Sequence, residues 1–296
     1  MKIIVLGAGA IGSLYGAKLS KLNEVVLVAR KEHADAINND GLSIIGLEKG
    51  IYHVKATAKI KKIEENTLIL LTTKVQDSEK TINGIKNLIR NDTLIICLQN
   101  GLYSENIVKR IIGNKCLVLR AITNFGAIFL KPGFVDYKGH SFTSIEKSPK
   151  SRKIADNFTK CGLNAYVSKD IKYDMWKKLV FNCVLNPVTA ILKIENMGIC
   201  DERLYPLKKI IIDECLKAAE KDGVKFNLDF LKILNEEFKM SRNISSMQQD
   251  LIKGKKTEID FLNGAVAWLG RKYGIECPVN EALACIIKSA ENQTKI

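Results

Sequence analysis

The chain has 296 residues, of which 46% are hydrophobic and 26% are charged, the balance of a soluble globular protein with room for two ordinary domains. No apolar run approaches the about 18 residues that a membrane-spanning helix needs, which excludes an integral membrane protein. The formal net charge of +14 favours anionic partners. Its lysines are spread along the chain without a basic tail, a zinc-finger pattern or an RNA-binding aromatic signature, so we expect no nucleic-acid partner.

The first half of the chain alternates helical stretches with apolar runs rich in branched residues. Runs of this kind are strands buried on both faces, as in a parallel sheet covered by helices. We therefore predict an α/β, Rossmann-type dinucleotide-binding domain over residues 1–168. Its expected strands are KIIVLGAG (2–9), EVVLVAR (24–30), TLILLTTK (67–74), TLIICLQNG (93–101) and CLVLRAIT (116–123).

The opening stretch, MKIIVLGAGAIGSLYGAKLS, fits either an export signal or a phosphate-binding turn. Gly7, Gly9 and Gly12 stand in G-x-G-x-x-G register between a strand and a helix, and a second strand follows at the distance this fold requires. The first glycine permits the tight turn, the second lets the backbone approach a pyrophosphate, and the third lets helix and strand pack closely. The spacing favours the dinucleotide site over the signal.

The residue after the second strand indicates which dinucleotide is bound. An NAD site usually has Asp or Glu there, to hold the ribose 2′-hydroxyl. Here Arg30 follows, with Lys31 next, and a guanidinium binds a 2′-phosphate well. We therefore predict NADPH rather than NADH. Lys74 and Asn100 end two further strands at the ligand-binding edge of the sheet. Lys74 fits either a solvated lysine or a contact with the adenosine ribose and phosphates. Asn100 fits orientation of the nicotinamide and a carbonyl substrate, with an ordinary turn former as the alternative.

The eight cysteines lie mostly inside apolar runs, with no C-x-x-C pair to indicate zinc or a redox dithiol. This favours reduced, structural thiols and a cytoplasmic location. We expect no metal site.

From residue 169 to 296 we predict an all-α domain. Helices are expected at 173–192, 204–223, 228–240, 257–274 and after Pro278. Lys178, Asn182 and Asn186 recur every four residues in the first of these, which places them on one helical face amid apolar residues. This line of polar residues fits a cleft wall, or else a face partly buried against the other domain. Pro187 predicts that the helix ends or kinks there.

Farther on, RNISSMQQD and EIDFLNG contain Asn243, Ser246 and Glu258. From the pattern alone, Ser246 fits a helix cap and Glu258 fits an ion pair with a neighbouring lysine.

The segments GAGAIG, TTK, QNG, WKKLVFNCVLNPVTAI, SSMQQD and EIDFLNG occur in this order, and together they resemble the ketopantoate reductases, the 2-dehydropantoate 2-reductases. The resemblance implies a dinucleotide-binding domain followed by a helical substrate domain. It also implies NADPH-dependent reduction of 2-dehydropantoate to pantoate, on the route to pantothenate.

The resemblance also implies residue roles. Lys178 is the expected general acid, and Glu258 the expected partner of the substrate hydroxyl and of that lysine. The expected substrate-binding residues are Asn100, Asn182, Asn186, Asn196, Asn243 and Ser246. The expected cofactor-binding residues are Gly7, Gly9, Ala10, Ile11, Gly12, Arg30, Lys74 and Asn100.

Two alternatives stay open: an NADPH-dependent reductase of another 2-oxo acid, and a catalytically idle NADPH-binding sensor. The expected partner is a small-molecule 2-oxo acid, and both a monomer and a homodimer are compatible with the sequence.

Overall fold

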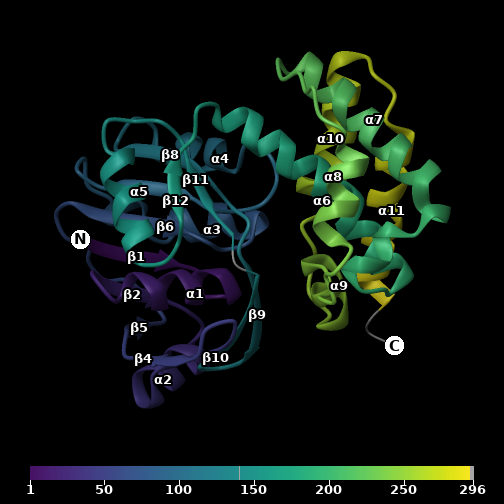
Figure 1. The fold of residues 1–296 in the computed structure, drawn as a ribbon. Helices are drawn as coiled ribbons and strands as arrows, with labels where there is room; N and C mark the ends of the chain where they lie inside the picture. Colours follow the sequence, from purple (N-terminus) through teal and green to yellow (C-terminus); the bar gives the residue numbers. More distant parts are fainter. Residues whose placement is uncertain (140, 294–296) are drawn as a thin grey trace. The chain divides into compact units, whose positions relative to one another are not determined.

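The structure is a computed structural model that describes residues 1–139 and 141–293. The chain divides into two compact units (Figure 1). The first contains residues 1–99 and 103–171, and the second contains residues 100–102 together with the chain from Lys172 onward. The predicted order, a Rossmann-type α/β part followed by an all-helical part, is confirmed.

The first unit is built from twelve strands in its described residues and from helices between them. The strands are β1 (Lys2–Leu6), β2 (Glu24–Val28), β3 (Leu42–Gly46), β4 (Gly50–Tyr52), β5 (Lys55–Thr57), β6 (Thr67–Leu71), β7 (Leu94–Cys97), β8 (Leu117–Thr123), β9 (Gly126–Lys131), β10 (Phe134–Gly139), β11 (Thr143–Ile145) and β12 (Ala165–Val167). The helices are α1 (Ala10–Leu19), α2 (Lys31–Asp40), α3 (Ser78–Asn83), α4 (Ser104–Ile112) and α5 (Ser151–Lys160), with short 3-10 turns η1 (Val75–Asp77) and η2 (Lys86–Leu88).

Eight of these strands form the main sheet, in the order β12-β11-β8-β7-β6-β1-β2-β5. The pairs from β8 through β5 are parallel, and only β11 runs antiparallel to its neighbour β8. Because β1 lies between β6 and β2, the loops that follow these three strands leave the same edge of the sheet side by side. All three loops carry predicted cofactor residues.

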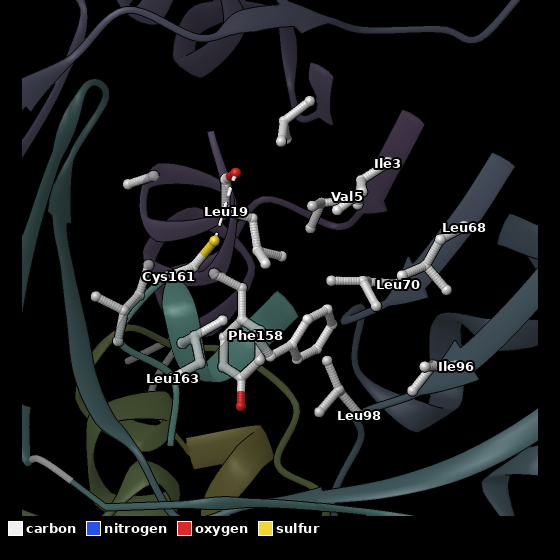
Figure 2. Close-up of a cluster of buried hydrophobic side chains, with 14 of the residues drawn as sticks. Ile3, Val5, Leu19, Leu68, Leu70, Ile96, Leu98, Phe158, Cys161 and Leu163 are labelled. Atoms are coloured by element: carbon white, nitrogen blue, oxygen red, sulfur yellow. Dashed lines mark hydrogen bonds between the residues drawn. The ribbon is translucent and has the colours of Figure 1, made fainter. Parts of the chain in front are cut away.

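Alternate residues of the central strands enter two separate cores, as expected for strands buried on both faces. One core gathers side chains of β1, β6 and the β7 end around Phe158 and Leu163 (Figure 2). There the Cys161 thiol lies 4.0 Å from the carbonyl oxygen of Leu19. The opposite core holds the alternate residues of the same strands together with α3 and α4: Ile4, Leu6, Ile69, Leu71, Ile95, Ile82 and Val108.

A second sheet of four strands, in the order β4-β3-β10-β9, was not predicted from the sequence. Its strands are short or only half-buried, so they lack the continuous apolar run that identifies the main sheet. Gly133, at φ +78°, forms the turn between β9 and β10.

The second unit is helical throughout its described residues. It contains α6 (Ile171–Leu192), α7 (Tyr205–Lys221), α8 (Phe230–Phe238), α9 (Ser246–Ile252), α10 (Asn263–Tyr273) and α11 (Pro278–Gln293), with 3-10 turns η3 (Asn196–Cys200), η4 (Glu202–Leu204) and η5 (Ile259–Phe261). The single helix expected at 257–274 is divided at Leu262 into η5 and α10.

The sequence predicted that helix α6 ends or kinks at Pro187. The predicted end is wrong, because α6 continues to Leu192. A proline removes the N–H that would bond the carbonyl four residues earlier, here that of Cys183. The side-chain amide of Asn263 donates to this carbonyl at 2.9 Å in its place. Asn263 also donates to Asn280 at 2.9 Å, and Asn280 in turn donates to the Glu214 carboxylate at 2.7 Å. A buried polar chain thus compensates for the proline.

We expect Asn263→Ala to lower the free energy of unfolding by about 2–3 kcal/mol, because two buried acceptors lose their donor. Asn263 is fully buried, so water does not replace it. Urea denaturation measures the change, with the exposed Asn227→Ala as a control that leaves stability within about 0.5 kcal/mol. An Asn263→Ala variant as stable as the parent protein contradicts the proposed compensation.

Candidate active site

The glycine turn at the end of β1 is shaped by close backbone packing. Gly7 has φ +103°, and a Cβ there would lie 2.6 Å from the backbone nitrogen of Thr73. A Cβ on Gly12 would lie 2.6 Å from Thr72 Oγ1 and closer still to the Gly7 carbonyl oxygen. Both positions therefore require glycine because of contacts with the protein's own backbone.

Gly9 differs, since a Cβ there would meet nothing nearer than the Gly7 carbonyl oxygen at 4.0 Å. The space above this residue is open, and Gly9 is also the N-cap of α1. The first-turn N–H groups of Ala10, Ile11 and Gly12 have no partners within the helix by geometry, and they carry the positive end of its dipole. An open turn below a helix N-terminus fits the pyrophosphate of a dinucleotide.

The two predicted basic residues flank this turn. Arg30 is exposed and is the N-cap of α2, immediately after β2 and Ala29. Lys74 is half-buried and precedes η1, after β6. Since the sheet order is β6-β1-β2, the two residues lie on opposite sides of the glycine turn. Arg30 and Lys74 therefore belong to separate parts of the candidate cofactor site.

His33, a residue that the sequence did not single out, lies buried beneath this region. Its Nε2 is 3.0 Å from Ser13 Oγ, and its Nδ1 accepts a hydrogen bond from the Gly133 N–H at 2.9 Å. The ring of Phe129 packs edge-on against it at 4.9 Å between centroids. Burial alone lowers the pKa of His33 below its ordinary value of 6.5.

This pKa shift predicts a pH-dependent stability. Below about pH 6.5 the unfolded chain binds a proton at His33 that the folded protein binds more weakly, so the free energy of unfolding falls as the pH falls. We expect the urea midpoint to drop between about pH 7.5 and about pH 5, and to drop less in His33→Gln. Asn227→Ala, at an exposed position that does not titrate, is the control and retains the parent's dependence. An equal drop in all three proteins contradicts the assignment.

In the helical unit, Lys178, Asn182 and Asn186 share one face of α6, as predicted. Lys178 and Asn182 are half-buried, and Asn186 is buried. The α6 face therefore presents an amine and amides within largely apolar surroundings, where charged and hydrogen-bonding groups interact more strongly than in water.

The start of α9 packs against the end of this polar face. Ser246 Oγ donates to Asn186 Oδ1 at 3.5 Å, so the structure brings these two predicted residues together. The expectation that Ser246 caps the helix is wrong, because Ser245 is the N-cap and its hydroxyl accepts from the Gln248 N–H at 3.3 Å. Ser245 is buried and bonds to Thr189, whereas Ser246 is exposed at the first helical position.

Asn196 and Asn243 also lie together, since the Asn196 N–H donates to the Asn243 carbonyl at 2.8 Å. The Asn196 side-chain amide is 3.5 Å from Ser241 Oγ, while its Oδ1 is buried and has no hydrogen-bond partner within the described parts of the chain. A buried amide oxygen that lacks a donor is the kind of group that a bound ligand can satisfy.

Asn100 and Glu258 are 158 positions apart in the sequence, yet they are hydrogen-bonded: Asn100 Nδ2 donates to Glu258 Oε2 at 3.0 Å. The segment Asn100–Leu102 clusters with the helical unit rather than with the sheet that precedes it. Gly101 has φ +79° and lies so close to Phe261 that a Cβ would be 2.5 Å from the Phe261 carbonyl oxygen. The glycine of QNG thus allows Asn100 to reach Glu258.

Residues that the sequence did not single out hold these segments in place. The Gln99 amide donates to the Thr73 carbonyl at 2.8 Å and lies 2.6 Å from Ser78 Oγ, which joins the loops after β6 and β7. The buried Arg120 donates to the Gln99 carbonyl. In the helical unit, Glu291 accepts from both the N–H and the hydroxyl of Thr257, at 2.7 and 2.6 Å. A polar residue inside an apolar strand, as Arg120 is, was the available signal.

All eight cysteines are free thiols, and burial raises the pKa of Cys97 to about 12. In the described part of the chain, no three His, Cys, Asp or Glu side chains gather as a metal site would require. None of the helices in these same residues is long and apolar enough to span a membrane.

Comparison with known proteins agrees with this architecture. The sequence profile described as "Ketopantoate reductase PanE/ApbA" matches residues 3–150, and "Ketopantoate reductase PanE/ApbA C terminal" matches residues 170–291. A 2-dehydropantoate 2-reductase of Pyrococcus horikoshii is 35% identical over 99% of this chain and 98% of its own length.

Two solved structures are similar over the whole length of both chains. A PanE/ApbA family ketopantoate reductase from Ralstonia eutropha has a TM-score of 0.92 and 27% identity. A D-mandelate dehydrogenase, solved with NADH and anilino(oxo)acetate, has a TM-score of 0.89 and 28% identity.

The sheet, the glycine turn and the helical second unit, together with these matches, define an oxidoreductase that works with a nicotinamide dinucleotide. Within that class the match extends over both units. The chain belongs to the ketopantoate reductase family.

Proposed function

We propose that the protein reduces 2-dehydropantoate to pantoate with NADPH. The observation that carries the proposal is the open glycine turn, found in a chain that matches the ketopantoate reductase family over both of its units. Residues 1–168 serve as the cofactor-binding domain in this proposal, and residues 169–296 as the substrate-binding domain.

The cofactor is held mainly by residues of the first unit, with Asn100 as the exception. Gly9 would leave room for the pyrophosphate, the N–H groups of Ala10, Ile11 and Gly12 would hold it, and Arg30 would bind the 2′-phosphate. Lys74 and Asn100 contribute from the loops after β6 and β7. When bound, the nicotinamide would supply a hydride to the ketone carbon.

The proton comes from the chain. The ammonium group of Lys178 hydrogen-bonds the ketone oxygen, polarises the carbonyl and then donates its proton to that oxygen. Glu258, fixed by the Asn100 amide at 3.0 Å, accepts from the substrate hydroxyl. Side chains of α6, of η3, of the loop before α9 and of α9 itself hydrogen-bond the remaining polar groups of the substrate. These residues are Asn182, Asn186, Asn196, Asn243 and Ser246.

A second candidate is the reduction of a different 2-oxo acid. The similarity to a D-mandelate dehydrogenase over the whole chain favours this second candidate. That dehydrogenase has the same architecture, and the compound in its name, mandelate, is aromatic. The cytoplasm is the expected location for either reaction, with the protein present as a monomer or a homodimer.

The test is a comparison of kcat/KM for 2-dehydropantoate with those for pyruvate, 2-oxoisovalerate and phenylglyoxylate, followed by NADPH oxidation. We expect 2-dehydropantoate to exceed each of the others by at least about a hundredfold, as a site that hydrogen-bonds the substrate hydroxyl discriminates against ketones without one. A higher value for phenylglyoxylate supports the second candidate, and NADPH binding without turnover of any substrate supports a sensor.

The cofactor preference gives a separate prediction for Arg30→Ala. We expect its Kd for NADPH to rise by about 10- to 100-fold, because a charge-assisted bond to the 2′-phosphate is lost, and its Kd for NADH to stay within about twofold. Fluorescence titration of both cofactors measures this. Arg152→Ala, at an exposed arginine of α5, is the matched control. Equal affinities of the parent protein for the two cofactors are incompatible with the assignment.

A further inference from the structure

His33 connects three elements that surround the candidate cofactor site. It belongs to the first turn of α2, its Nε2 reaches Ser13 on α1 at 3.0 Å, and its Nδ1 reaches the Gly133 N–H in the β9–β10 turn at 2.9 Å. Its side chain is buried, although it lies only three positions after the exposed Arg30. This histidine has no role in the proposed catalysis.

The hydrogen bonds define which ring nitrogen carries the proton. Nδ1 accepts from the Gly133 N–H and is therefore unprotonated, so the neutral ring carries its proton on Nε2 and donates it to Ser13 Oγ. Ser13 in turn donates to the Ala8 carbonyl at 3.2 Å. A continuous chain of bonds thus runs from Gly133 through His33 and Ser13 to the glycine turn.

The same histidine fixes the beginning of α2. The Arg30 carbonyl accepts from the N–H groups of His33 and Ala34, both at 3.0 Å, so the backbone of Arg30 and that of His33 form one turn. On the other side, Gly7 and Ala8 both donate to the Val28 carbonyl of β2. The backbone and the His33 side chain therefore join the glycine turn to the Arg30 turn at two separate places.

We propose that His33 is a positioning residue that holds Arg30 at a fixed distance from the glycine turn, and that it thereby supports selection of a dinucleotide with a 2′-phosphate. The inference rests on the proposed function, in which the glycine turn holds the pyrophosphate and Arg30 holds the 2′-phosphate. The two phosphate groups belong to one ligand, so the two turns that bind them must keep a matching separation.

The spacing matters for only one of the two cofactors. NADH uses the glycine turn but has no 2′-phosphate for Arg30, so a displaced α2 N-terminus leaves its affinity unchanged. NADPH needs both turns at once. If His33 has a purely structural role, its loss instead weakens the binding of both cofactors equally. The ratio of the two dissociation constants is therefore the informative quantity.

The experiment measures Kd for NADPH and for NADH in the parent protein, in Ser13→Ala, in His33→Asn and in Arg30→Ala. Ser13→Ala removes the hydroxyl that receives the His33 proton and is a small change that preserves the fold. His33→Asn retains an acceptor for the Gly133 N–H but no longer reaches Ser13. We expect both to raise Kd for NADPH by about three- to tenfold, with Kd for NADH within about twofold.

Combining Ser13→Ala with Arg30→Ala tests whether the effect passes through Arg30. We expect the double variant to bind NADPH as Arg30→Ala does, since no 2′-phosphate contact remains to be positioned. The inference is overturned if Ser13→Ala weakens the binding of both cofactors equally. It is also overturned if the effects of the two substitutions on the Kd for NADPH add in the double variant.

The outcomes for the inference and for the proposed function are distinguishable. If Arg30→Ala leaves the ratio of the two dissociation constants unchanged, the proposed cofactor site fails and the inference fails with it. If Arg30→Ala lowers the preference for NADPH and Ser13→Ala does not, the inference alone is overturned.

Discussion

Lys178→Ala is expected to lower kcat by about 10²- to 10⁴-fold, the contribution of a positioned proton donor. Alanine retains the helix, because it has the highest helix propensity. Apart from Asn100, the residues proposed to hold the cofactor belong to the other unit. We therefore expect Kd for NADPH to change by less than about twofold. Single-turnover oxidation of NADPH in the presence of 2-dehydropantoate measures the loss at the chemical step.

The neighbouring lysine provides the control. Lys177 is also half-buried in α6, one position away, and so it points about 100° away around the helix. Lys177→Ala is expected to retain kcat within about threefold, because a nearby residue outside the chemistry has little effect on the transition state. Near-normal turnover in Lys178→Ala would remove the proposed mechanism, and a similar loss in both variants would indicate a charge effect instead of proton donation.

Gly9→Ala is expected to fold normally and to bind NADPH about 10- to 100-fold more weakly. The added Cβ would meet nothing closer than 4.0 Å in the protein itself, and the backbone at Gly9 is extended, with φ −76°, so the folded chain accommodates alanine. The methyl group instead occupies the space proposed for the pyrophosphate, and a clash of this size costs about 1–3 kcal/mol. Thermal melting and cofactor titration measure the two effects separately.

Gly12→Ala is the matched comparison. Its Cβ would collide with the Gly7 carbonyl and lie 2.6 Å from Thr72 Oγ1, so this variant should lose stability as well as affinity. Gly9→Ala with a lowered melting temperature, or with unchanged NADPH affinity, contradicts the assignment of the open space to the pyrophosphate.

Five of the eight strands of the main sheet, β1, β2, β6, β7 and β8, could be predicted because they lie in apolar runs rich in branched residues, whereas the short strands β5, β11 and β12 were not. β1, β6 and β7 are buried at nearly every position, and a buried strand requires an unbroken apolar run. The strands of the second sheet have no such requirement: β4 is mostly exposed and β9 is half-buried. Their pairing depends on partners far along the chain, such as β3 with β10, which no local pattern reveals.

In the helical unit, local rules failed where distant residues override them. Pro187 correctly signals a missing N–H, but the donor that replaces it comes from Asn263, 80 positions away from Cys183. The same limit applies to the candidate site. Spacing places Lys178, Asn182 and Asn186 on one face, whereas the bond from Asn100 to Glu258 depends on tertiary folding. His33 was missed because a single histidine in a polar helix carries no sequence signal.

The central claim, hydride transfer to a ketone carbon with a proton from the chain, is tested most directly by isotope transfer. The protein is incubated in ordinary water with 2-dehydropantoate and NADPH that carries two deuterium atoms at C4 of the nicotinamide, and the product is examined by mass spectrometry. We predict pantoate with one deuterium, located at C2. Pantoate without deuterium, or no pantoate at all, would contradict the account.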